Sequence, residues 1–255
     1  MAEGAAADRR PAFYAARAGV WRDWWTLLHP PYTLWHLSYV AIGAGVSPRF
    51  DAGRFVATVA AFFLAVGVAA HALDELNDRP LRTRISGRAL LLAALIGLGG
   101  AAAIGVAMLV AVAGDPAFVV IALVGIATGL LLVVAYNIEL FGGRLHNDVT
   151  FAAAWGAFPA LAAYYAQAEM IGMAAVPACG AAFAISYAQR ALSNQARFVR
   201  RQVDTLQIEM RTTDGATERS GIGFVLSPIE AALRALSWGT VLTGAALIVA
   251  RLLNG

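Results

Sequence analysis

The chain contains no lysine: all 19 of its basic residues are arginine. This absence excludes a lysine Schiff base and a lysine phosphate clamp. Any recognition of phosphate therefore falls to arginine, whose planar guanidinium makes bidentate contacts with anionic oxygens. Cysteine is nearly absent as well. The single Cys179 lies in an apolar run and cannot form an internal disulfide, so it gives no information on the redox compartment.

Charge is also scarce. Charged residues make up 14% of the 255 residues and hydrophobic residues 60%, whereas soluble domains carry about 25% charged residues. With a mean hydropathy of +0.66, this composition is typical of an integral membrane protein with a single membrane domain. The formal net charge is +3, but the arginines lie in short segments between apolar runs, where they read as topology signals. We therefore expect membrane lipid, and no nucleic acid, as a partner.

Seven apolar runs follow one another along the chain. Most reach the ~20 residues that a helix needs to cross the hydrocarbon core, and they do not alternate as barrel strands do. The sequence therefore predicts an all-α, polytopic transmembrane helical bundle of about seven spans, in a domain covering residues 21–255 that follows a cytoplasmic segment, residues 1–20. The predicted spans are 31–48, 53–76, 89–113, 117–137, 148–167, 171–193 and 228–253.

Arginine is distributed unevenly between the two sides of this predicted bundle. The N-terminal segment and the second-to-third, fourth-to-fifth and sixth-to-seventh connections carry most of it, whereas the opposite side has only Arg49, Arg54 and Arg251. The positive-inside rule places the N-terminus of this multi-pass cell-membrane protein in the cytoplasm and, with seven spans, the C-terminus outside. The one long polar segment, 195–227, is expected as a cytoplasmic loop, either a partly helical lid or a flexible connection.

The densest group of charges is residues 71–88, HALDELNDRPLRTRISGR, directly after the second apolar run. His71, Asp74, Glu75 and Asp78 follow the i, i+3, i+4, i+7 spacing, so on a helix they share one polar face. Carboxylates four residues apart suit Mg²⁺, which commonly bridges protein oxygens to substrate phosphates. The alternative is a salt-bridge cluster in which the carboxylates pair with the arginines that follow, namely Arg79, Arg82 and Arg84.

This stretch resembles the first Asp-rich motif of the UbiA superfamily of intramembrane prenyltransferases, NDxxDxxxD. Asp74 and Asp78 match the second and third Asp of the motif, and the segment RPLRTRISGRAL (79–90) resembles the basic loop that follows it. The leading Asn-Asp of the motif is Ala70-His71 in this chain. In the family this motif binds the diphosphate of an isoprenoid donor through Mg²⁺.

Two further segments extend the resemblance, which covers roughly residues 24–203. In AYNIELFGGRLHND (135–148), Tyr136 matches the family pattern, while the family's basic position is Leu140 and Arg144 lies one turn beyond it. WGAFPALAAYYA (155–166) is similar to the helix containing Gly and Pro that follows in the family. The arrangement of a short first span, an acidic second span and a basic loop is also similar.

The family's second Asp-rich motif should end the sixth span, where this chain has ALSNQARFVRRQVD (191–204). Asn194 fits a family position, but arginine replaces the expected carboxylates. Arg190, Asn194, Arg197 and Arg201 share one helical face. Two interpretations are open: the arginines bind diphosphate oxygens directly, so that fixed positive charge replaces one metal, or they pair with the acidic face and only lock two helices together.

The resemblance implies an enzyme that transfers an isoprenyl group from a prenyl diphosphate to an unknown small acceptor, with Mg²⁺ as cofactor and the site on the cytoplasmic side. The implied catalytic residues are Asp74, Asp78, Arg84, Arg144, Arg197 and Arg201, of which Asp74 and Asp78 hold the metal. The implied substrate-binding residues are His71, Glu75, Tyr136 and Asn194. A UbiA-type terpene cyclase, which needs no separate acceptor, fits the same residues. The non-enzymatic alternative is a UbiA-fold membrane protein that binds an isoprenoid without catalysis.

Overall fold

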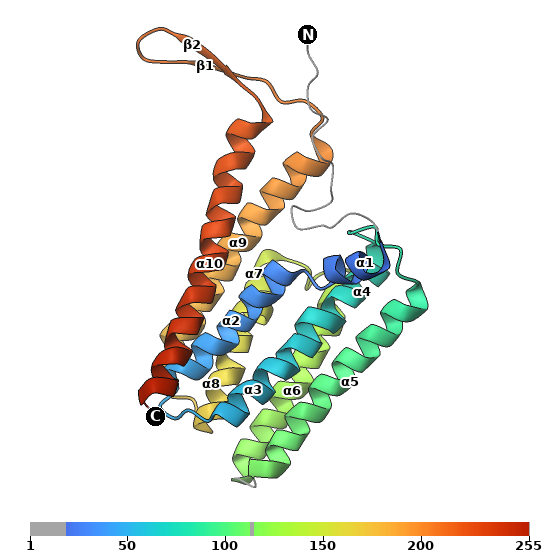
Figure 1. Ribbon diagram of the computed structural model, residues 1–255, viewed down its shortest axis with the longest axis vertical. Helices are drawn as coiled ribbons and strands as arrows, with labels where there is room; N and C mark the ends of the chain where they lie inside the picture. The colour runs from blue at the N-terminus through green and yellow to red at the C-terminus, as the bar shows by residue number, and fades with distance from the viewer. Residues whose placement is uncertain (1–18, 113–114, 255) are drawn as a thin grey trace.

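The computed structural model describes residues 19–112 and 115–254, and these residues are mainly helical (Figure 1). The predicted N-terminal segment, 1–20, lies almost wholly outside the described residues. The elements in chain order are α1 (Val20–Leu27), α2 (Pro30–Val46), α3 (Ala52–Phe62), the π-helix η1 (Phe63–Ala70), α4 (His71–Asp78), α5 (Gly87–Val112), α6 (Pro116–Asn137), α7 (Asp148–Phe151), the π-helix η2 (Ala152–Ala157), α8 (Phe158–Ala168), α9 (Ala175–Gln202), β1 (Ile208–Arg211), β2 (Thr217–Ser220) and α10 (Ile222–Asn254).

Five helices within the described residues are long and apolar enough to cross a membrane. They are Ala52–Asp78, which joins α3, η1 and α4; α5; α6; Asp148–Ala168, which joins α7, η2 and α8; and α10. The all-α prediction is confirmed, and the five helices mark a membrane protein. The predicted spans 31–48 and 171–193 fall on α2, which has only 17 residues, and on α9, whose second half is polar. A total of seven spans therefore stays a prediction.

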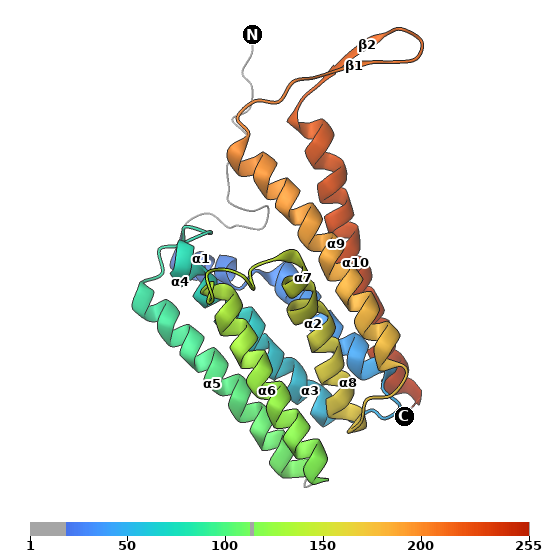
Figure 2. The ribbon, with the colours of Figure 1, turned by 180° about the vertical axis from the view of Figure 1, so that it is seen from behind.

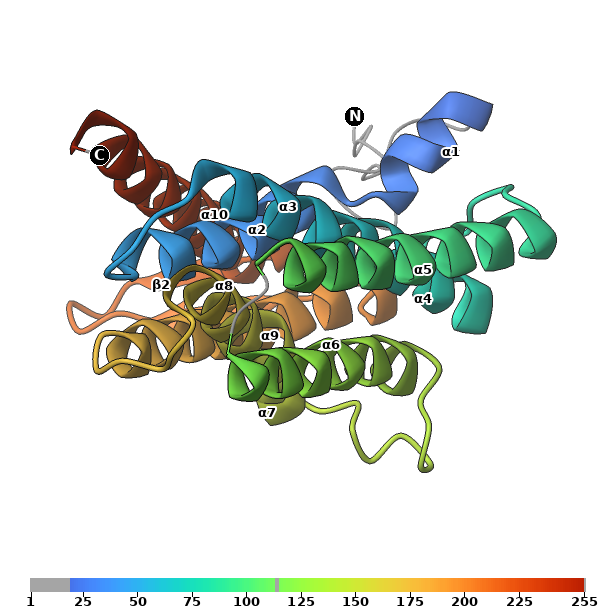
Figure 3. The same ribbon diagram turned by 90° about the horizontal axis from the view of Figure 1, so that it is seen from below.

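The helix α2 lies inside the bundle, packed against α8 and α10. Two of its glycines make this close packing possible. A Cβ on Gly43 would lie 2.0 Å from the carbonyl oxygen of Ala160 in α8, and one on Gly45 would lie 2.6 Å from the Cβ of Leu247 in α10. A larger residue at either position would force the helices apart. Figure 3 shows the bundle from below, with α10 and α5 at opposite sides.

The helices α9 and α10 extend well beyond the others, on the side where α1 and α4 lie (Figures 1 and 2). The 33 residues of α10 correspond to about 50 Å of helix, whereas the hydrocarbon core measures about 30 Å. An antiparallel hairpin, in which Ile208 pairs with Ser220, joins the two helices. The segment 195–227, predicted as a partly helical lid or a flexible connection, consists of the end of α9, the hairpin and the first turns of α10.

Candidate functional site

A polar cavity of about 270 Å³ lies where the ends of the long helices meet, between the start of α2, α4, the end of α6, the helix Asp148–Ala168, α9 and α10. All four histidines of the chain line it, together with five arginines. Two carboxylates, Asp74 and Glu230, also line it, so the lining carries a formal excess of three positive charges when histidine is neutral. The basic lining residues are His29, His36, His71, His146, Arg190, Arg197, Arg200, Arg201 and Arg234.

Two π-helical segments lead into this cavity. The segment η1 ends directly before His71, and η2 contains Trp155; both residues line the cavity. Such segments are rare and often occur at functional sites. Both segments also supply backbone acceptors: the carbonyl of Gly67 in η1 accepts a hydrogen bond from Nδ1 of His71 at 3.1 Å, and the carbonyl of Trp155 accepts one from Nδ1 of His36 at 3.0 Å.

His29 and His71 form a stacked pair at the inner wall of the cavity. Their ring centroids are 4.4 Å apart with an interplanar angle of 20°. His29 caps the start of α2 in the left-handed conformation, with φ at +46°. Burial, assisted by the nearby charges of His71, Arg197, Arg201 and His36, holds the pKa of His29 well below its usual range. The folded protein therefore favours the neutral form of His29. As the pH falls below the ordinary histidine pKa of about 6.5, the unfolded chain takes up a proton that the folded chain does not, so the folded state becomes less stable.

The predicted acidic face is divided by the structure. His71 and Asp74 line the cavity, but Glu75 is fully buried beside the loop 79–86 and Asp78 is exposed at the helix end. The helix stops there because Arg79 adopts the left-handed conformation, φ +51°. Among the described residues, no ion pair joins these carboxylates to Arg79, Arg82 or Arg84, so the salt-bridge cluster considered above is not formed.

Glu75 holds the loop that follows α4. Its carboxylate accepts hydrogen bonds from the backbone nitrogens of Leu81 and Thr83 at 2.9 and 2.7 Å and from the Thr83 hydroxyl at 2.9 Å. Arg79 closes the same loop by donating to the carbonyl of Ile85 at 2.7 Å. Leu81, placed in this way, lines the polar cavity. Glu75 therefore shapes the cavity wall indirectly instead of facing a ligand.

We expect Glu75→Gln to destabilise the protein by about 1–3 kcal/mol, because an amide NH₂ would replace one of the two oxygens that accept backbone hydrogen bonds in a buried position. The measurement is thermal unfolding in detergent, combined with trypsin cleavage after Arg82 and Arg84. The matched control is Asp78→Asn, the same loss of charge one turn later at an exposed side chain. Equal unfolding temperatures and equal cleavage rates for the two variants would contradict this role of Glu75.

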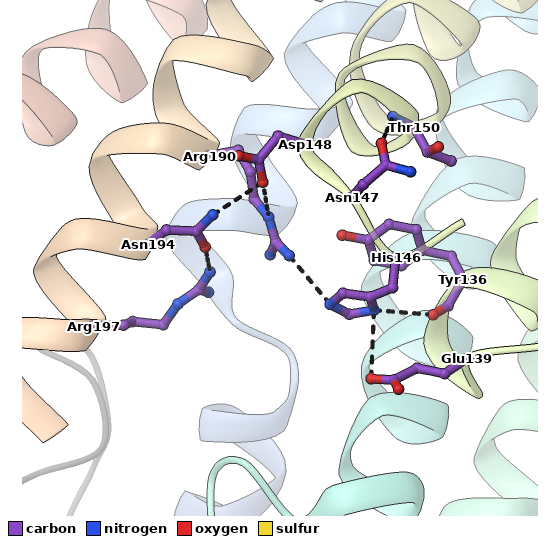
Figure 4. A network of polar contacts seen from close by, with 9 residues as sticks. All are labelled: Tyr136, Glu139, His146, Asn147, Asp148, Thr150, Arg190, Asn194 and Arg197. Atoms are coloured by element: carbon purple, nitrogen blue, oxygen red, sulfur yellow. Dashed lines mark hydrogen bonds and ion pairs between the residues drawn. The ribbon is translucent and has the colours of Figure 1, made fainter. Parts of the chain in front are cut away.

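A network of polar contacts connects α6, α7 and α9 along one side of the cavity (Figure 4). The Asp148 carboxylate accepts from Nε of Arg190 at 3.2 Å and from the side-chain amide of Asn194 at 3.0 Å. Asn194 in turn accepts from Arg197. Of the α9 arginines, Arg190 is thus oriented directly by Asp148 of α7, and Arg197 is oriented through Asn194. Both interpretations of these arginines, direct binding of an anion and a lock between two helices, therefore stay predictions.

His146 closes the network on the other side. Its Nδ1 lies 3.3 Å from the carbonyl oxygen of Tyr136 and its Nε2 lies 3.2 Å from Nη2 of Arg190. Because arginine only donates, Nε2 is the acceptor of this contact, and Nδ1 also faces Oε1 of Glu139 at 3.8 Å (Figure 4). The imidazole also stacks on the Tyr136 ring, with centroids 4.5 Å apart. Tyr136 and Arg190 are thereby held at adjacent positions of the wall.

The structure brings together about half of the residues implied by the resemblance. Those that line the cavity are His71, Asp74, Tyr136, Arg197 and Arg201. Asn194 contacts Asp148 and Arg197 at its edge. Asp78, Arg84 and Arg144 are exposed and do not line it. The backbone nitrogen of Arg84 instead donates to the Asp23 carboxylate at 3.1 Å, which ties the loop to α1.

Several lining residues were not predicted. They include His29, which precedes α2, and His36, which lies on α2. They also include Arg200 on α9 and Arg234 on α10; Nε of Arg200 donates to Glu230 at 2.7 Å. Periodicity along one helix cannot reveal them, because packing between helices brings them to the site. One signal was available: all four histidines of a membrane chain lie close to predicted span ends.

A second cavity, of about 240 Å³ and almost wholly apolar, lies between Ala52–Asp78, α5, α6 and Asp148–Ala168. Its wall includes Phe62, Val66, Gly105, Gly125, Val133 and Trp155. Trp155 lines the polar cavity as well. The two spaces therefore adjoin at this side chain, and a molecule with an anionic head and an apolar tail would find both environments next to each other.

The cavity offers few side chains that could bind a divalent metal. No group of three or more His, Cys, Asp or Glu side chains is placed to hold a metal within the part of the chain that the structure describes. Of the acidic helix, only Asp74 faces the cavity. One or two carboxylates together with substrate phosphates are a common Mg²⁺ environment, so the residues fit a metal that is bound jointly with a phosphate ligand. Two buried oxygens of the lining, Tyr136 Oη and Gln189 Oε1, have no hydrogen-bond partner among the described residues.

Comparison of the chain with family models, curated proteins and solved structures finds no match.

Proposed function

We propose that this membrane protein is a UbiA-like prenyltransferase that ionises an isoprenyl diphosphate and transfers the isoprenyl group to a small acceptor. The observation that carries the proposal is the shared wall of the two cavities, since Trp155 borders both the arginine-lined space and the apolar one. A diphosphate head suits the first space because the arginine excess favours anions. An isoprenoid tail suits the second because its burial removes apolar surface from water.

In this proposal Arg197 and Arg201 bind diphosphate oxygens. Asp74 would hold Mg²⁺ jointly with oxygens of the same diphosphate. Bound Mg²⁺ would neutralise part of the charge that builds up on the departing diphosphate. The arginines add fixed positive charge at the same place, where stabilisation of the developing anion lowers the barrier most. The hydrogen bonds from Arg197 to Asn194 and from Asn194 to Asp148 orient the Arg197 side chain at this wall of the cavity.

Aromatic rings would stabilise the allylic cation left behind. Tyr32, Tyr136, Phe151 and Trp155 line the polar cavity, and the centroids of Tyr136 and Trp155 are 4.5 Å apart. The faces of such rings attract cations by about 2 kcal/mol or more when water is excluded. A cation formed beside Trp155 would lie between the diphosphate head and the tail in the apolar cavity.

The orientation belongs to the same proposal. Pro80 and Leu81, in the loop after α4, line the polar cavity, so the cavity lies at the same end of the bundle as this arginine-rich loop. The C-terminal end of α10 lies at the opposite end (Figure 1). If α2 and α9 are counted with the five long apolar helices, the chain has seven spans. The positive-inside rule then places the cavity on the cytoplasmic side of the membrane and the C-terminus outside.

The test is release of inorganic diphosphate from geranyl, farnesyl and geranylgeranyl diphosphate by the purified chain in detergent with Mg²⁺. We expect release from at least one donor, and loss of release when EDTA removes the metal. No release from any of the three donors, with or without added phenolic acceptors, would sink the enzymatic proposal.

One observation favours a different function. Of the carboxylates on α4 only Asp74 lines the cavity, so a metal there would have fewer carboxylate ligands than a site built from two aspartates of this helix. A non-catalytic protein that binds an isoprenoid would show farnesyl diphosphate binding in calorimetry without release of diphosphate. A terpene cyclase would release diphosphate and form a cyclic hydrocarbon with no acceptor present.

A further inference from the structure

The chemistry of an allylic cation requires a proton acceptor, and this further inference rests on the proposed function. When the cation attacks an acceptor, the acceptor must lose a proton; without an acceptor, the cation itself sheds a proton to form a diene. Neither step needs a strong base, because a carbocation is a strong acid. A neutral group with an open lone pair, placed beside the breaking bond and shielded from water, is sufficient.

Most ionisable groups of the polar cavity cannot take this proton. Its five arginines stay protonated, and Glu230 is ion-paired with Arg200. Asp74 is assigned to the metal and the diphosphate, and Nε2 of His146 accepts from Arg190. The diphosphate itself is a poor base when guanidinium groups and a metal surround it. The remaining candidates are the imidazoles of His29 at the N-cap of α2, His36 on α2 and His71 on α4, and only His71 is on the helix that carries Asp74.

His71 is the imidazole best placed for the task. Its Nδ1 donates to the carbonyl of Gly67 at 3.1 Å, so the lone pair is on Nε2, which has no hydrogen-bond partner among the described residues. The ring is stacked against His29, which fixes its plane. His71 precedes Asp74 by three residues on one helix, and such side chains are neighbours with Cβ atoms about 5–6 Å apart. Both residues line the cavity.

We infer that His71 is a catalytic base whose Nε2 takes the proton shed in the reaction. The C1–O bond of the allylic diphosphate breaks and its electron pair leaves with the diphosphate. The acceptor forms a new bond to C1 and transfers a proton to Nε2 of His71. The imidazolium then returns this proton to water at the cavity mouth, and the neutral ring is restored. No redox partner is needed.

His36 provides the internal comparison. Its Nδ1 also donates to a backbone carbonyl, that of Trp155, and it also lines the cavity. It lies on α2, however, packed among the rings of Trp35, Tyr39 and Phe151, and is not on the helical face that carries Asp74. The same substitution can therefore be made at two histidines with matched hydrogen bonds, only one of which neighbours the proposed diphosphate.

The experiment compares the wild type with His71→Asn and His36→Asn, using farnesyl diphosphate and Mg²⁺ in detergent without an acceptor. Asparagine keeps a donor near the position of Nδ1, so the backbone hydrogen bond can persist, while Nε2 is removed. Diphosphate release reports ionisation. The cation gives farnesenes when it loses a proton and farnesol or nerolidol when it captures water. The ratio of farnesenes to these alcohols therefore measures how efficiently a base removes the proton. Gas chromatography measures this ratio, and thermal unfolding checks the fold.

We expect His71→Asn to release diphosphate while its farnesene-to-alcohol ratio falls about tenfold or more, in keeping with the usual contribution of a general base, and His36→Asn to keep the wild-type ratio. An unchanged ratio in His71→Asn, a fall only in His36→Asn, or alcohols as the sole wild-type products would each overturn the assignment while leaving the prenyl-transfer proposal intact. Absence of any diphosphate release from the wild type would overturn both. If His71→Asn does not fold, His71→Gln, which places an amide near Nε2 that cannot take up a proton, is read in the same way.

Discussion

Replacing Asp74 by asparagine should reduce Mg²⁺-dependent diphosphate release by at least about 100-fold, whereas replacing Asp78 should leave the rate within about twofold. The two carboxylates lie four residues apart on one helix, yet only Asp74 lines the polar cavity and Asp78 is exposed beyond it. Asparagine keeps the size of the side chain and removes the charge that would hold the metal. Asp78→Asn is therefore a control that matches the substitution, the helix and the change in net charge.

The metal dependence of the same pair gives a second measurement. Because Glu230, the other carboxylate of the cavity, is ion-paired with Arg200, Asp74 alone is left for the metal, and Mg²⁺ should bind measurably only when the diphosphate supplies further oxygens. Calorimetry with Mg²⁺ alone should show no binding at micromolar to millimolar metal, and binding should appear once farnesyl diphosphate is present. Equal losses of release in the two variants would mean that both carboxylates act at the metal and that α4 closes over the ligand in a way this structure does not show.

Enlarging Gly125 to phenylalanine should change which donor length the protein accepts. Gly125 lines the apolar cavity, and a Cβ there would meet no atom within 4 Å, so the ring would enter the cavity instead of colliding with the wall. Gly125 precedes Tyr136 by 11 positions on α6, about 16 Å along the helix axis. The substitution would therefore shorten the space below the diphosphate without touching the polar site.

For Gly125→Phe we expect release from geranylgeranyl diphosphate to fall about tenfold or more, as filling an occupied apolar space costs about 1–3 kcal/mol, while release from geranyl diphosphate stays within about twofold. The control is Gly99→Phe on α5, where a Cβ also meets no atom within 4 Å but the position is exposed and outside the cavity. Parallel losses for all donor lengths would argue that the tail lies elsewhere.

The helices of this fold were largely predictable because apolar runs long enough to cross a membrane form helices almost regardless of detail. The run predicted at 53–76 is the helix Ala52–Asp78, and that at 117–137 is α6. The apolar run predicted as a span ended at 193, whereas α9 continues to Gln202, as the helical face through Arg201 had indicated, because a helix outside the bilayer needs no apolar sequence. The hairpin was missed although Asp214-Gly215 marks its turn, a known signal between short strands.

The candidate site was predictable in part. Spacing correctly brought His71 and Asp74 to one face, but it could not show that the helix ends at Asp78 or that the loop 79–86 folds back onto Glu75. Both depend on local backbone geometry, which helical periodicity ignores. The role of Asp148 in orienting Arg190 and Asn194 depends on contacts between residues more than 40 positions apart. Such contacts are set by how the helices pack.

The π-helical segment η1 separates the helix Ala52–Asp78 into two halves that can change independently during evolution. Because π-turns are wider than α-turns, they alter the angular phase between the residues before Phe63 and those after Ala70. Gain or loss of one residue inside η1 would rotate His71 and Asp74 relative to Thr58 and Phe62 while leaving both halves helical. Small insertions or deletions in η1 could thus change the polar cavity, which His71 and Asp74 line, separately from the apolar cavity, which Thr58 and Phe62 line, while the rest of the helix stays the same.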